Sequence, residues 1–374
     1  MKVLHLIGGG DIGGAKVHVL SLVKELGKKI DVKIVAFRPG VFYEEAQDMG
    51  IDIEIVRTGS IITDVLKVKK IIKNGNFQII HAHGSKGNLV ASILKIFCKI
   101  PAITTIHSDY RLDYMGSIWR TCTLGFINKI ALRFMDYYIA VSNNFKEMLV
   151  KRKFNPDRIF ILYNGTDFSQ PLKNYSKEEF IKKYNIPISG NDMVVGILAR
   201  LDPVKGLDIF LKGAKLVLEK RPEVKFLIAG EGEQRSNLIN LSKKLGISDS
   251  VFFLGWVTDP YEFMSNVDIP ALTSLSESFS YTILESAMLK KTIVSSDVGG
   301  ISDLIEHGKN GFLFAPGDYN ALSDYIIKLI DSSELRAKMG QKLHEKASSK
   351  FSLENMVNTQ LDIYNKVQEK YPVR

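Results

Sequence analysis

The chain has 374 residues, of which 45% are hydrophobic and 24% are charged, and it carries a formal net charge of +9. This length and composition suit two folded domains and exclude a disordered, collagen-like or coiled-coil protein. Two cysteines, Cys98 and Cys122, are too few for a disulfide scaffold or a cysteine-rich zinc module. No segment has the pattern of a signal peptide or of an apolar membrane span, so we expect a cytoplasmic protein.

Short apolar runs alternate with amphipathic segments in the first part of the chain. We expect strands at residues 2–7, 32–37, 53–56, 79–82, 102–106 and 138–141, and helices at 15–28, 42–49, 64–73, 85–95 and 117–134. This alternation predicts a parallel sheet with helices on both faces.

A second series of the same kind follows the polar stretch 169–190. We expect strands at residues 193–198, 225–229, 251–254, 268–272, 292–295 and 311–313, and helices at 206–221, 233–245, 319–331, 334–351 and 354–371. The sequence therefore predicts an α/β protein with two Rossmann-like, doubly wound domains, 1–170 and 171–352, facing a central cleft, and a last helix in 353–374. Ligands of such sheets bind beyond the carboxyl ends of the strands.

The excess of positive charge is confined to the first half. Residues 1–170 contain 24 Lys and Arg against 15 Asp and Glu, whereas residues 171–374 contain 26 of each. Basic and aromatic side chains mix in one segment, and an earlier predicted helix carries a basic run: Arg111, Tyr114, Trp119, Arg120, Phe126, Lys129, Arg133 and Phe134, and Lys67, Lys69, Lys70 and Lys73. Such a surface suits an anionic membrane. The alternative is a core-facing stripe with a solvated basic face. No nucleic-acid-binding pattern accompanies the charge, so we expect no nucleic-acid partner.

The first glycine cluster, Gly8-Gly9-Gly10-Asp11-Ile12-Gly13, fits G-x-G-x-x-G between a predicted strand and a predicted helix. Glycines allow a phosphate to approach the backbone, and a helix start offers free N–H groups. A dinucleotide site also needs an acid after the second strand, where Arg38 stands instead and would suit the 2′-phosphate of NADP. A tight turn that needs glycine only for packing is the alternative.

Charged residues in the second half form two spaced pairs. Arg200 and Lys205 lie on one loop after a predicted strand, where both could bind a diphosphate. Glu277 is expected in a loop, and Glu285 in a helix that starts near residue 283. Residues 280–282 would then offer free amides to an anion. The alternatives are a solvated basic loop, a turn carboxylate and an acid placed to suit the helix dipole.

Histidines cluster near predicted strand ends. His107 follows the strand 102–106, where it is either a functional group or a structural hydrogen-bonding group. We expect His81 and His83, two positions apart on one strand, to point to opposite faces and therefore not to share a metal ion. They are interpreted as part of a strand-end loop beside an acceptor site.

Together these features resemble the retaining nucleotide-sugar glycosyltransferases of family 4, which have the GT-B fold. The resemblance covers nearly the whole chain. Its most specific parts are the E-x7-E segment from Glu277 to Glu285 and the loop from Arg200 to Gly206. Further matching segments occur in the family's order: Gly13-Gly14, Thr105-Ile106-His107-Ser108-Asp109, Val141-Ser142, Asn164-Gly165-Thr166-Asp167, Asp297-Val298-Gly299-Gly300 and Asn310-Gly311-Phe312-Leu313.

The resemblance implies roles for the matching residues. Arg200 and Lys205 would hold the donor diphosphate, Glu277 the transferred sugar and Glu285 the ribose hydroxyls, while His107 would lie against the sugar near the reacting centre. The implied catalytic set is His107, Arg200, Lys205 and Glu277. The implied donor-binding set is Gly13, Gly14, Arg200, Lys205, Glu277, Phe279, Ser280, Tyr281, Thr282 and Glu285. The first domain would bind the acceptor, the second the nucleotide-sugar, and the last helix would cross back to the first.

The expected activity is a retaining, metal-independent sugar transfer. The donor would be a nucleotide diphosphate-sugar, by family a UDP-sugar, and the acceptor a hydroxyl of a lipid-linked or saccharide molecule in bacterial surface polysaccharide or glycolipid synthesis. No Asp-x-Asp sequence occurs, and we expect neither a metal nor another cofactor. A peripheral position on the inner face of the cell membrane would bring the protein to a lipid-linked acceptor. Two alternatives are an NADP-linked oxidoreductase and a non-catalytic, membrane-associated sugar-binding protein of the same fold.

Overall fold

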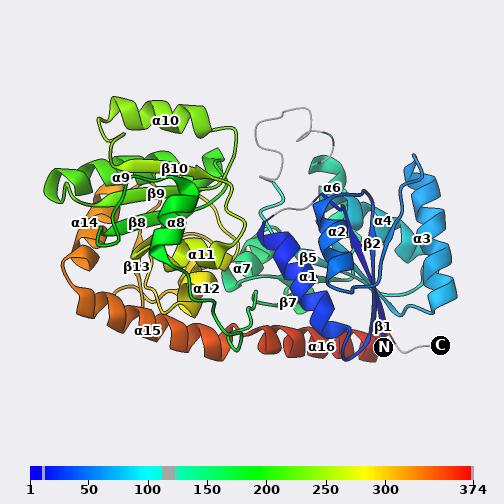
Figure 1. Cartoon of the computed structure of the whole chain (residues 1–374). Helices are drawn as coiled ribbons and strands as arrows, with labels where there is room; N and C mark the ends of the chain where they lie inside the picture. Colours follow the sequence, from blue (N-terminus) through cyan, green and yellow to red (C-terminus); the bar gives the residue numbers. More distant parts are fainter. Residues whose placement is uncertain (11–12, 112–122, 124, 372–374) are drawn as a thin grey trace. The chain divides into compact units, whose positions relative to one another are not determined.

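A computed structural model describes residues 1–10, 13–111, 123 and 125–371 (Figure 1). The chain forms two compact units. The first unit consists of Met1–Gly165 and Leu353–Arg374, and the second of Thr166–Ser352. Each unit is built on one parallel sheet. Among the described helices, none combines the length and the apolar character needed to span a bilayer.

The sheet of the first unit has seven strands in the order β3-β2-β1-β4-β5-β6-β7. The strands are β1 Lys2–Ile7, β2 Asp31–Ala36, β3 Ile53–Ile55, β4 Ile79–His83, β5 Ala102–Ile106, β6 Tyr137–Ala140 and β7 Ile159–Ile161. The helices are α1 Gly14–Leu26, α2 Val41–Asp48, α3 Ile61–Gly75, α4 Gly84–Cys98, α6 Phe126–Arg133, α7 Asn143–Lys151 and α16 Leu353–Lys370. The order changes direction between β1 and β4, as in a doubly wound sheet.

Alternate residues of β1 and β4 bury two different faces of this sheet. Leu4 and Leu6 pack with α3 and α4 residues such as Val68 and Leu94. On the opposite face, Val3 and Ile79 pack with residues of α1 and α16, including Leu22, Leu26, Tyr364 and Val367. Successive side chains of a strand point to opposite faces, so residues two apart share one face. This rule places the histidines of β1 and β4 on the face covered by α1 and α16.

The second unit has six strands in the order β10-β9-β8-β11-β12-β13. The strands are β8 Val194–Leu198, β9 Lys225–Ala229, β10 Val251–Gly255, β11 Ile269–Leu272, β12 Val294–Ser296 and β13 Phe312–Phe314. The helices are α8 Lys177–Tyr184, α9 Leu207–Lys220, α10 Arg235–Lys244, α11 Pro260–Ser265, α12 Tyr281–Met288, α13 Ile301–Leu304, α14 Tyr319–Ile330 and α15 Ser333–Lys350. One core joins Val195 and Phe226 of the sheet to Phe210 of α9 and Leu322 of α14.

Several elements differ from the prediction. Helix α8 lies inside the stretch 169–190, which was expected to be a polar connection. Its N-cap Ser176 accepts a hydrogen bond from the backbone N–H of Glu179 at 3.3 Å, but Phe180 is its one buried residue, so the apolar pattern is weak. Helix α12 begins at Tyr281 rather than near residue 283. Tyr114, Trp119, Arg120 and Cys122 lie outside the described residues, as do Asp11 and Ile12.

Candidate functional site

The predicted donor-binding residues of the second unit lie where three neighbouring strands end. Arg200 and Lys205 follow β8, Glu277 follows β11, and the Gly299-Gly300 turn follows β12. These three strands are adjacent and parallel, so their carboxyl ends meet at one edge of the sheet. The structure therefore brings the three loops together, although they are far apart in the sequence.

An ion pair joins the first two of these loops. Lys205 Nζ donates a hydrogen bond to Glu277 Oε1, which also accepts one from Ser274 Oγ at 2.9 Å. The two charged side chains are 18% and 13% exposed, so they are mostly, but not fully, withdrawn from water. Thr273 Oγ1 donates to the Lys205 carbonyl at 3.0 Å, which fixes the backbone beside the ion pair.

Two glycines allow the loops to pack this closely. Gly206 has φ +61°, and a Cβ atom there would lie 2.3 Å from the Thr273 carbonyl oxygen. Gly299 has φ +56°, and its Cβ would lie 1.5 Å from the carbonyl oxygen of Glu277. The N–H of Gly300 donates to the Ser278 carbonyl at 3.0 Å. The position of Glu277 thus depends on the absence of a side chain in the third loop.

Arg200 has a different environment from Lys205. Its guanidinium is half exposed and lies 3.1 Å from the Asp202 carboxylate, three residues before Lys205 on the same loop. Both cations are therefore paired with a carboxylate, but the half-exposed Arg200 side chain is more accessible to an anion from solution than Lys205 is.

Helix α12 carries the remaining predicted residues of this unit. Ser280 is its buried N-cap residue, and its side chain makes no capping hydrogen bond, so the first amides of the helix are open to an acceptor. Phe279 is buried against Phe351, with ring centroids 5.2 Å apart, so its side chain serves the core. Thr282 lies in the first turn of α12, where its carbonyl accepts from Ser286 Oγ at 2.9 Å.

Glu285 lies one turn after Tyr281 on this helix. Burial, with a smaller contribution from the negative charge of Asp259, raises the pKa of the Glu285 carboxyl to about 7. The Tyr281 hydroxyl is buried and has no hydrogen-bond partner among the described residues. Burial also raises the Tyr281 pKa. This pair therefore offers polar atoms whose hydrogen-bonding capacity the described chain does not use.

The glycines of the first cluster have two different roles: Gly9 and Gly10 pack against Arg38, and Gly13 and Gly14 begin helix α1. Gly9 has φ +85°, and a Cβ on Gly10 would overlap the guanidinium of Arg38. Arg38 thus packs on this turn. Gly13, with φ +77°, is the N-cap of α1, and Gly14 is its first residue. Among the described residues, a Cβ on Gly13 would meet nothing within 4 Å, so the conformation, rather than space, favours glycine there.

His107 follows β5 and is hydrogen-bonded to a second histidine. Its Nε2 atom lies 3.0 Å from His83 Nδ1, and its ring centroid lies 4.7 Å from that of His18. Burial, with a further contribution from His18, holds the pKa of His107 well below its usual range. The imidazole of His107 is therefore neutral at physiological pH, and it can donate or accept a hydrogen bond but cannot supply a positive charge.

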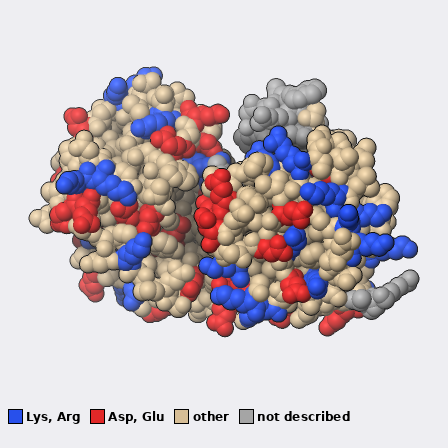
Figure 2. Space-filling model, turned by 45° about the vertical axis from the view of Figure 1, so that its right-hand side comes forward, with Lys and Arg blue, Asp and Glu red and all other residues tan. Residues whose placement is uncertain are grey.

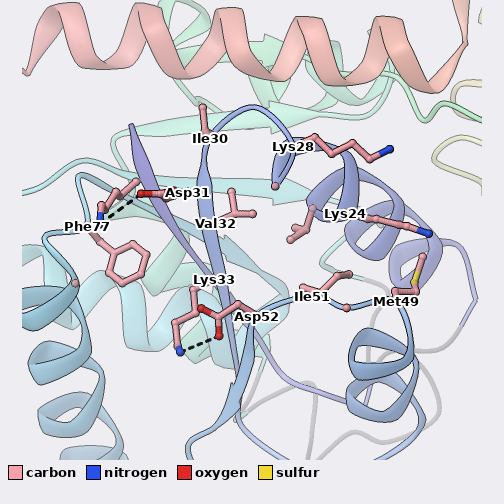
Figure 3. A pocket seen from close by; sticks show the side chains of 15 residues that line it. Lys24, Lys28, Ile30, Asp31, Val32, Lys33, Met49, Ile51, Asp52 and Phe77 are labelled. Atoms are coloured by element: carbon pink, nitrogen blue, oxygen red, sulfur yellow. Dashed lines mark hydrogen bonds and ion pairs between the residues drawn. The ribbon is translucent and has the colours of Figure 1, made fainter.

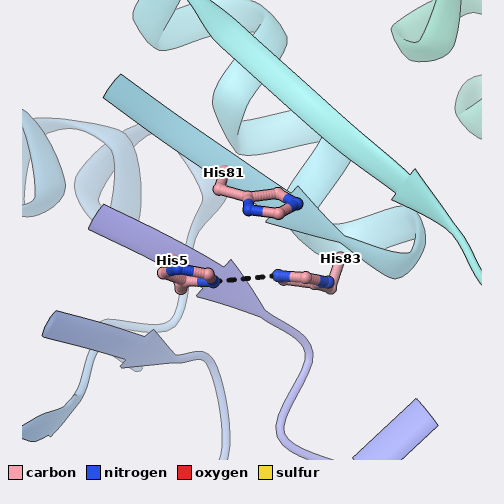
Figure 4. Close-up of side chains that lie close together, drawn as sticks. All are labelled: His5, His81 and His83. Carbon is pink, nitrogen blue, oxygen red and sulfur yellow. Dashed lines mark hydrogen bonds between the residues drawn. The ribbon is translucent and has the colours of Figure 1, made fainter. Parts of the chain in front are cut away.

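The expected divergence of His81 and His83 was wrong. Residues two apart on a strand share a face, and the two rings stack with centroids 4.4 Å apart. His5 of β1 joins them, since its Nδ1 atom lies 3.0 Å from His83 Nε2 (Figure 4). One nitrogen of each of these three residues lies within 4.8 Å of the others, a spacing that could admit a metal ion. The expected absence of a metal remains a prediction.

Three participants in this cluster were missed by sequence reasoning: His5, His18 and Tyr364. His5 could have been found, because β1 and β4 are neighbours in a doubly wound sheet and histidines on them share a face. His18 Nδ1 donates to Asn164 Oδ1 at 2.7 Å. Its Nε2 atom is buried without a partner in the described part of the chain. No pattern in the residues around Tyr364 could have predicted its part in the cluster, because its partners His81 and His5 are distant in the sequence and meet it only in the folded protein.

A surface pocket of about 590 Å³ lies elsewhere, at the amino ends of β1 and β2 (Figure 3). Its charged side chains include two pairs, Lys2 with Asp31 at 3.4 Å and Lys33 with Asp52 at 3.0 Å. Ligands of open parallel sheets bind at the carboxyl ends of the strands. This pocket is therefore separate from the candidate site.

The two halves of the chain match two described families. Residues 12–170 match Glycosyltransferase Family 4, and residues 176–346 match Glycosyl transferases group 1. Among similar proteins, the O-antigen biosynthesis glycosyltransferase WclY of Escherichia coli is 27% identical over 98% of both chains. The UDP-Gal:alpha-D-GlcNAc-diphosphoundecaprenol alpha-1,3-galactosyltransferase of Escherichia coli is 23% identical over 83% of this chain and 81% of its own.

Solved structures show the same architecture. The crystal structure of Anabaena Alr3699/HepE in complex with UDP-glucose matches with a TM-score of 0.86 and 23% sequence identity, over 98% of this chain and 100% of that chain. The likeness shows that the two proteins share a fold.

Proposed function

The chain belongs to the glycosyltransferases of family 4 and has their GT-B fold, and on that premise we propose that it transfers a sugar from a UDP-sugar to a hydroxyl group. The observation that carries this proposal is the arrangement in the second unit. There, the Lys205–Glu277 pair lies at the sheet edge that also holds Arg200 and the open amides of α12.

Charge separation explains how this arrangement would act. When the bond from the sugar to the diphosphate breaks, negative charge grows on the departing phosphate. Arg200, Lys205 and the α12 amides are donors held in place before the reaction, and such preorganised groups stabilise developing charge strongly. Lys205 would exchange part of its interaction with Glu277 for the phosphate. Glu277 would then be released to accept hydrogen bonds from sugar hydroxyls.

The remaining residues receive narrower roles in this proposal. Glu285 would accept from the ribose hydroxyls, and Gly14 would contribute an amide from the start of α1. Neutral His107 would hydrogen-bond the transferred sugar. Retention of the anomeric configuration and independence from metal ions complete the proposed reaction. The Arg38 guanidinium lies against the glycine turn, and this contact favours the interpretation that the glycines serve packing over the interpretation that Arg38 binds the 2′-phosphate of NADP.

The relatives suggest the class of acceptor. WclY is named for O-antigen biosynthesis, and the galactosyltransferase is named for a diphosphoundecaprenol-linked sugar. We propose that this chain likewise extends a saccharide or lipid-linked saccharide in bacterial surface polysaccharide or glycolipid synthesis.

A surface feature of the first unit favours contact with a lipid membrane. Phe126, Ile130 and Phe134 are spaced four apart on and just after α6, and they are 58%, 45% and 53% exposed. Lys129 and Arg133 on the same helix are also exposed, and Figure 2 shows further Lys and Arg side chains on the surface of this unit. Apolar side chains flanked by positive charge suit the surface of an anionic bilayer. We propose that this surface holds the enzyme at the inner face of the membrane.

Binding and turnover measurements test the function. The free protein would be titrated with UDP, GDP, ADP and NADP and with UDP-sugars, while its melting temperature is recorded. A nucleotide at about 100 times its Kd stabilises a protein by roughly 2.7 kcal/mol, which raises the melting temperature by a few degrees. We expect stabilisation by UDP, and turnover of a UDP-sugar that persists in EDTA. Stabilisation by NADP alone would contradict the proposal, and binding without turnover would favour a sugar-binding protein.

Vesicle binding tests the membrane contact separately. The protein should sediment with vesicles that contain anionic lipid and be released by high salt, because salt screens the attraction. The double substitution F126S/F134S should weaken sedimentation without changing UDP binding. Equal sedimentation of the variant and the parent would remove α6 from the contact.

A further inference from the structure

Six side chains of the first unit form one continuous line of hydrogen bonds, which we call the histidine chain. His107 Nε2 lies 3.0 Å from His83 Nδ1, and His83 Nε2 lies 3.0 Å from His5 Nδ1 (Figure 4). His5 Nε2 lies 3.2 Å from the Tyr364 hydroxyl, which lies 2.6 Å from His81 Nδ1. His81 Nε2 ends the line at Thr105 Oγ1, 2.7 Å away.

The sheet register explains why the line is continuous. His5 and His81 are paired across β1 and β4, and His83 is paired with Thr105 across β4 and β5. All of these residues point to the face covered by α16, which supplies the Tyr364 hydroxyl. Every member of the chain except His107 is buried. The line therefore leads from the core to His107, at the carboxyl edge of the sheet.

Neutral imidazoles constrain how such a line can be protonated. A neutral histidine has one N–H donor and one nitrogen acceptor, and a hydroxyl donates one hydrogen bond. Burial lowers the pKa of His5 to about 3 and holds those of His81, His83 and His107 well below their usual range. With every ring neutral, each bond needs one donor and one acceptor. Two arrangements satisfy all five bonds and also use the Tyr364 hydroxyl proton within the line, one with every proton directed toward His107 and one with every proton directed away from it.

We propose that the histidine chain is a positioning device that holds His107 in one tautomer and one ring orientation. If the protons run toward His107, its Nε2 atom accepts and its Nδ1 atom carries the proton. If they run away, its Nε2 atom donates and Nδ1 is a free acceptor. The hydrogen bond that His107 can offer a substrate is therefore set partly by Tyr364, 257 positions later in the sequence. This inference rests on the proposed role of His107 in sugar transfer.

Metal coordination is the competing explanation for the same cluster. His5, His81 and His83 are close enough to bind an ion. However, both ring nitrogens of each residue already have hydrogen-bond partners. A shared ion would have to replace several of these bonds. The hydrogen-bonded chain accounts for all six nitrogens without doing so.

Removal of one hydroxyl tests the proposal. Tyr364→Phe keeps the ring and cuts the chain at its centre. Tyr138→Phe is a matched control, because its buried hydroxyl donates to the Leu132 carbonyl at 2.7 Å in the same unit but outside the chain. We expect Tyr364→Phe to lower kcat about tenfold or more, with the KM for the donor nearly unchanged, and Tyr138→Phe to leave kcat near that of the parent.

The tautomer itself can be observed without any turnover. In protein labelled with ¹⁵N-histidine, the two ring nitrogens have different chemical shifts in each tautomer. We expect His107 to show one tautomer in the parent and in Tyr138→Phe, and a changed or mixed state in Tyr364→Phe. Identical His107 shifts in Tyr364→Phe would overturn the proposal, even if the enzyme is active. If Tyr364→Phe changes the His107 tautomer but the parent protein has no transferase activity, the histidine chain would stand and the proposed function would be wrong.

Substitutions of Thr105, at the far end of the histidine chain, provide a second test if Tyr364→Phe folds poorly. Thr105→Val removes the last hydroxyl, and Thr105→Ser restores it. We expect His107 to show a changed or mixed tautomer in Thr105→Val and the parent tautomer in Thr105→Ser. Failure of Thr105→Ser to restore the parent tautomer would contradict the histidine chain. Metal analysis of the purified parent adds a further check. Stoichiometric metal that disappears in His81→Asn would overturn the hydrogen-bonded chain in favour of a metal centre.

Discussion

Glu285 shows how its environment changes the chemistry of a single carboxyl group. Its pKa of about 7 results first from burial and second from the charge of Asp259. The folded protein therefore binds a proton at Glu285 between about pH 4.5 and pH 7 that the unfolded chain has released. The contribution of Glu285 to stability falls as the pH rises through that interval. A ligand that donates hydrogen bonds to the Glu285 carboxylate would favour its ionised form and so lower its pKa.

We predict that the affinity for UDP increases as the pH rises from 6 to 8. Ribose hydroxyls would bind ionised Glu285, so binding must first remove its proton at pH 6. The gain can approach tenfold for each pH unit below the pKa. Isothermal titration calorimetry at both pH values measures it. In Glu285→Gln the affinity should be lower and nearly independent of pH, and an equal pH dependence in that variant would assign the effect to another group.

We predict that Arg200→Ala weakens UDP binding by more than tenfold. A hydrogen bond to a charged group contributes roughly 1.5–3 kcal/mol, and the half-exposed guanidinium is open to a diphosphate. The matched control is Arg221→Ala, at the other end of α9, where the arginine pairs with Asp331. The control should bind UDP like the parent. Unchanged affinity in Arg200→Ala would exclude Arg200 from the site.

At the scale of secondary-structure elements, loops form the proposed donor site more than helices do. The loops after β8, β11 and β12 meet because their strands are adjacent, and glycines permit the close contact. Sequence patterns located these strands well, since buried parallel strands are short continuous apolar runs. Helix α8 was missed because Phe180 is its one buried residue. Helix α12, which carries Glu285 of the E-x7-E segment, begins two residues before the expected start.

We predict that Gly299→Ala displaces Glu277, whereas Gly308→Ala does not. Both glycines have positive φ, so each substitution pays a similar conformational cost of about 1–2 kcal/mol. The Gly299 Cβ would also overlap the Glu277 carbonyl, while the Gly308 Cβ would meet no atom of the described chain within 4 Å. Melting temperature and UDP affinity should fall further in Gly299→Ala. Equal losses in the two variants would show that the loop contact is unimportant.

At the scale of the whole molecule, the two units contain very different titratable groups. Five of the seven histidines lie together in the first unit, and burial lowers the pKa of every one of them, to about 3 for His5 and about 4 for His18. In the unfolded chain these groups titrate near pH 6.5. Below that pH the unfolded state binds more protons, so acid favours unfolding.

We predict that the first unit loses stability between pH 7 and pH 5. The free energy of unfolding falls by at most about 1.4 kcal/mol per pH unit for each histidine, or by roughly 7 kcal/mol per pH unit for the five together. Hydrogen exchange with mass spectrometry can follow each unit separately. After correction for the intrinsic exchange rate, peptides of β1 and β4 should lose protection in acid while those of β8 keep it. Equal losses in both units would contradict the assignment to the buried histidines.

The sequence by itself determined the alternating strands and helices and the family, and it supplied the charged residues of the proposed donor site. Local periodicity and short spacings carry this information, because each depends on residues that are close in the chain. Only the tertiary structure decided that Arg38 packs on the glycine turn and that His81 and His83 share a face with His5, Thr105 and Tyr364. Those contacts join residues as many as 359 positions apart, and they form only when parallel strands and a distant helix pack on one face of a sheet.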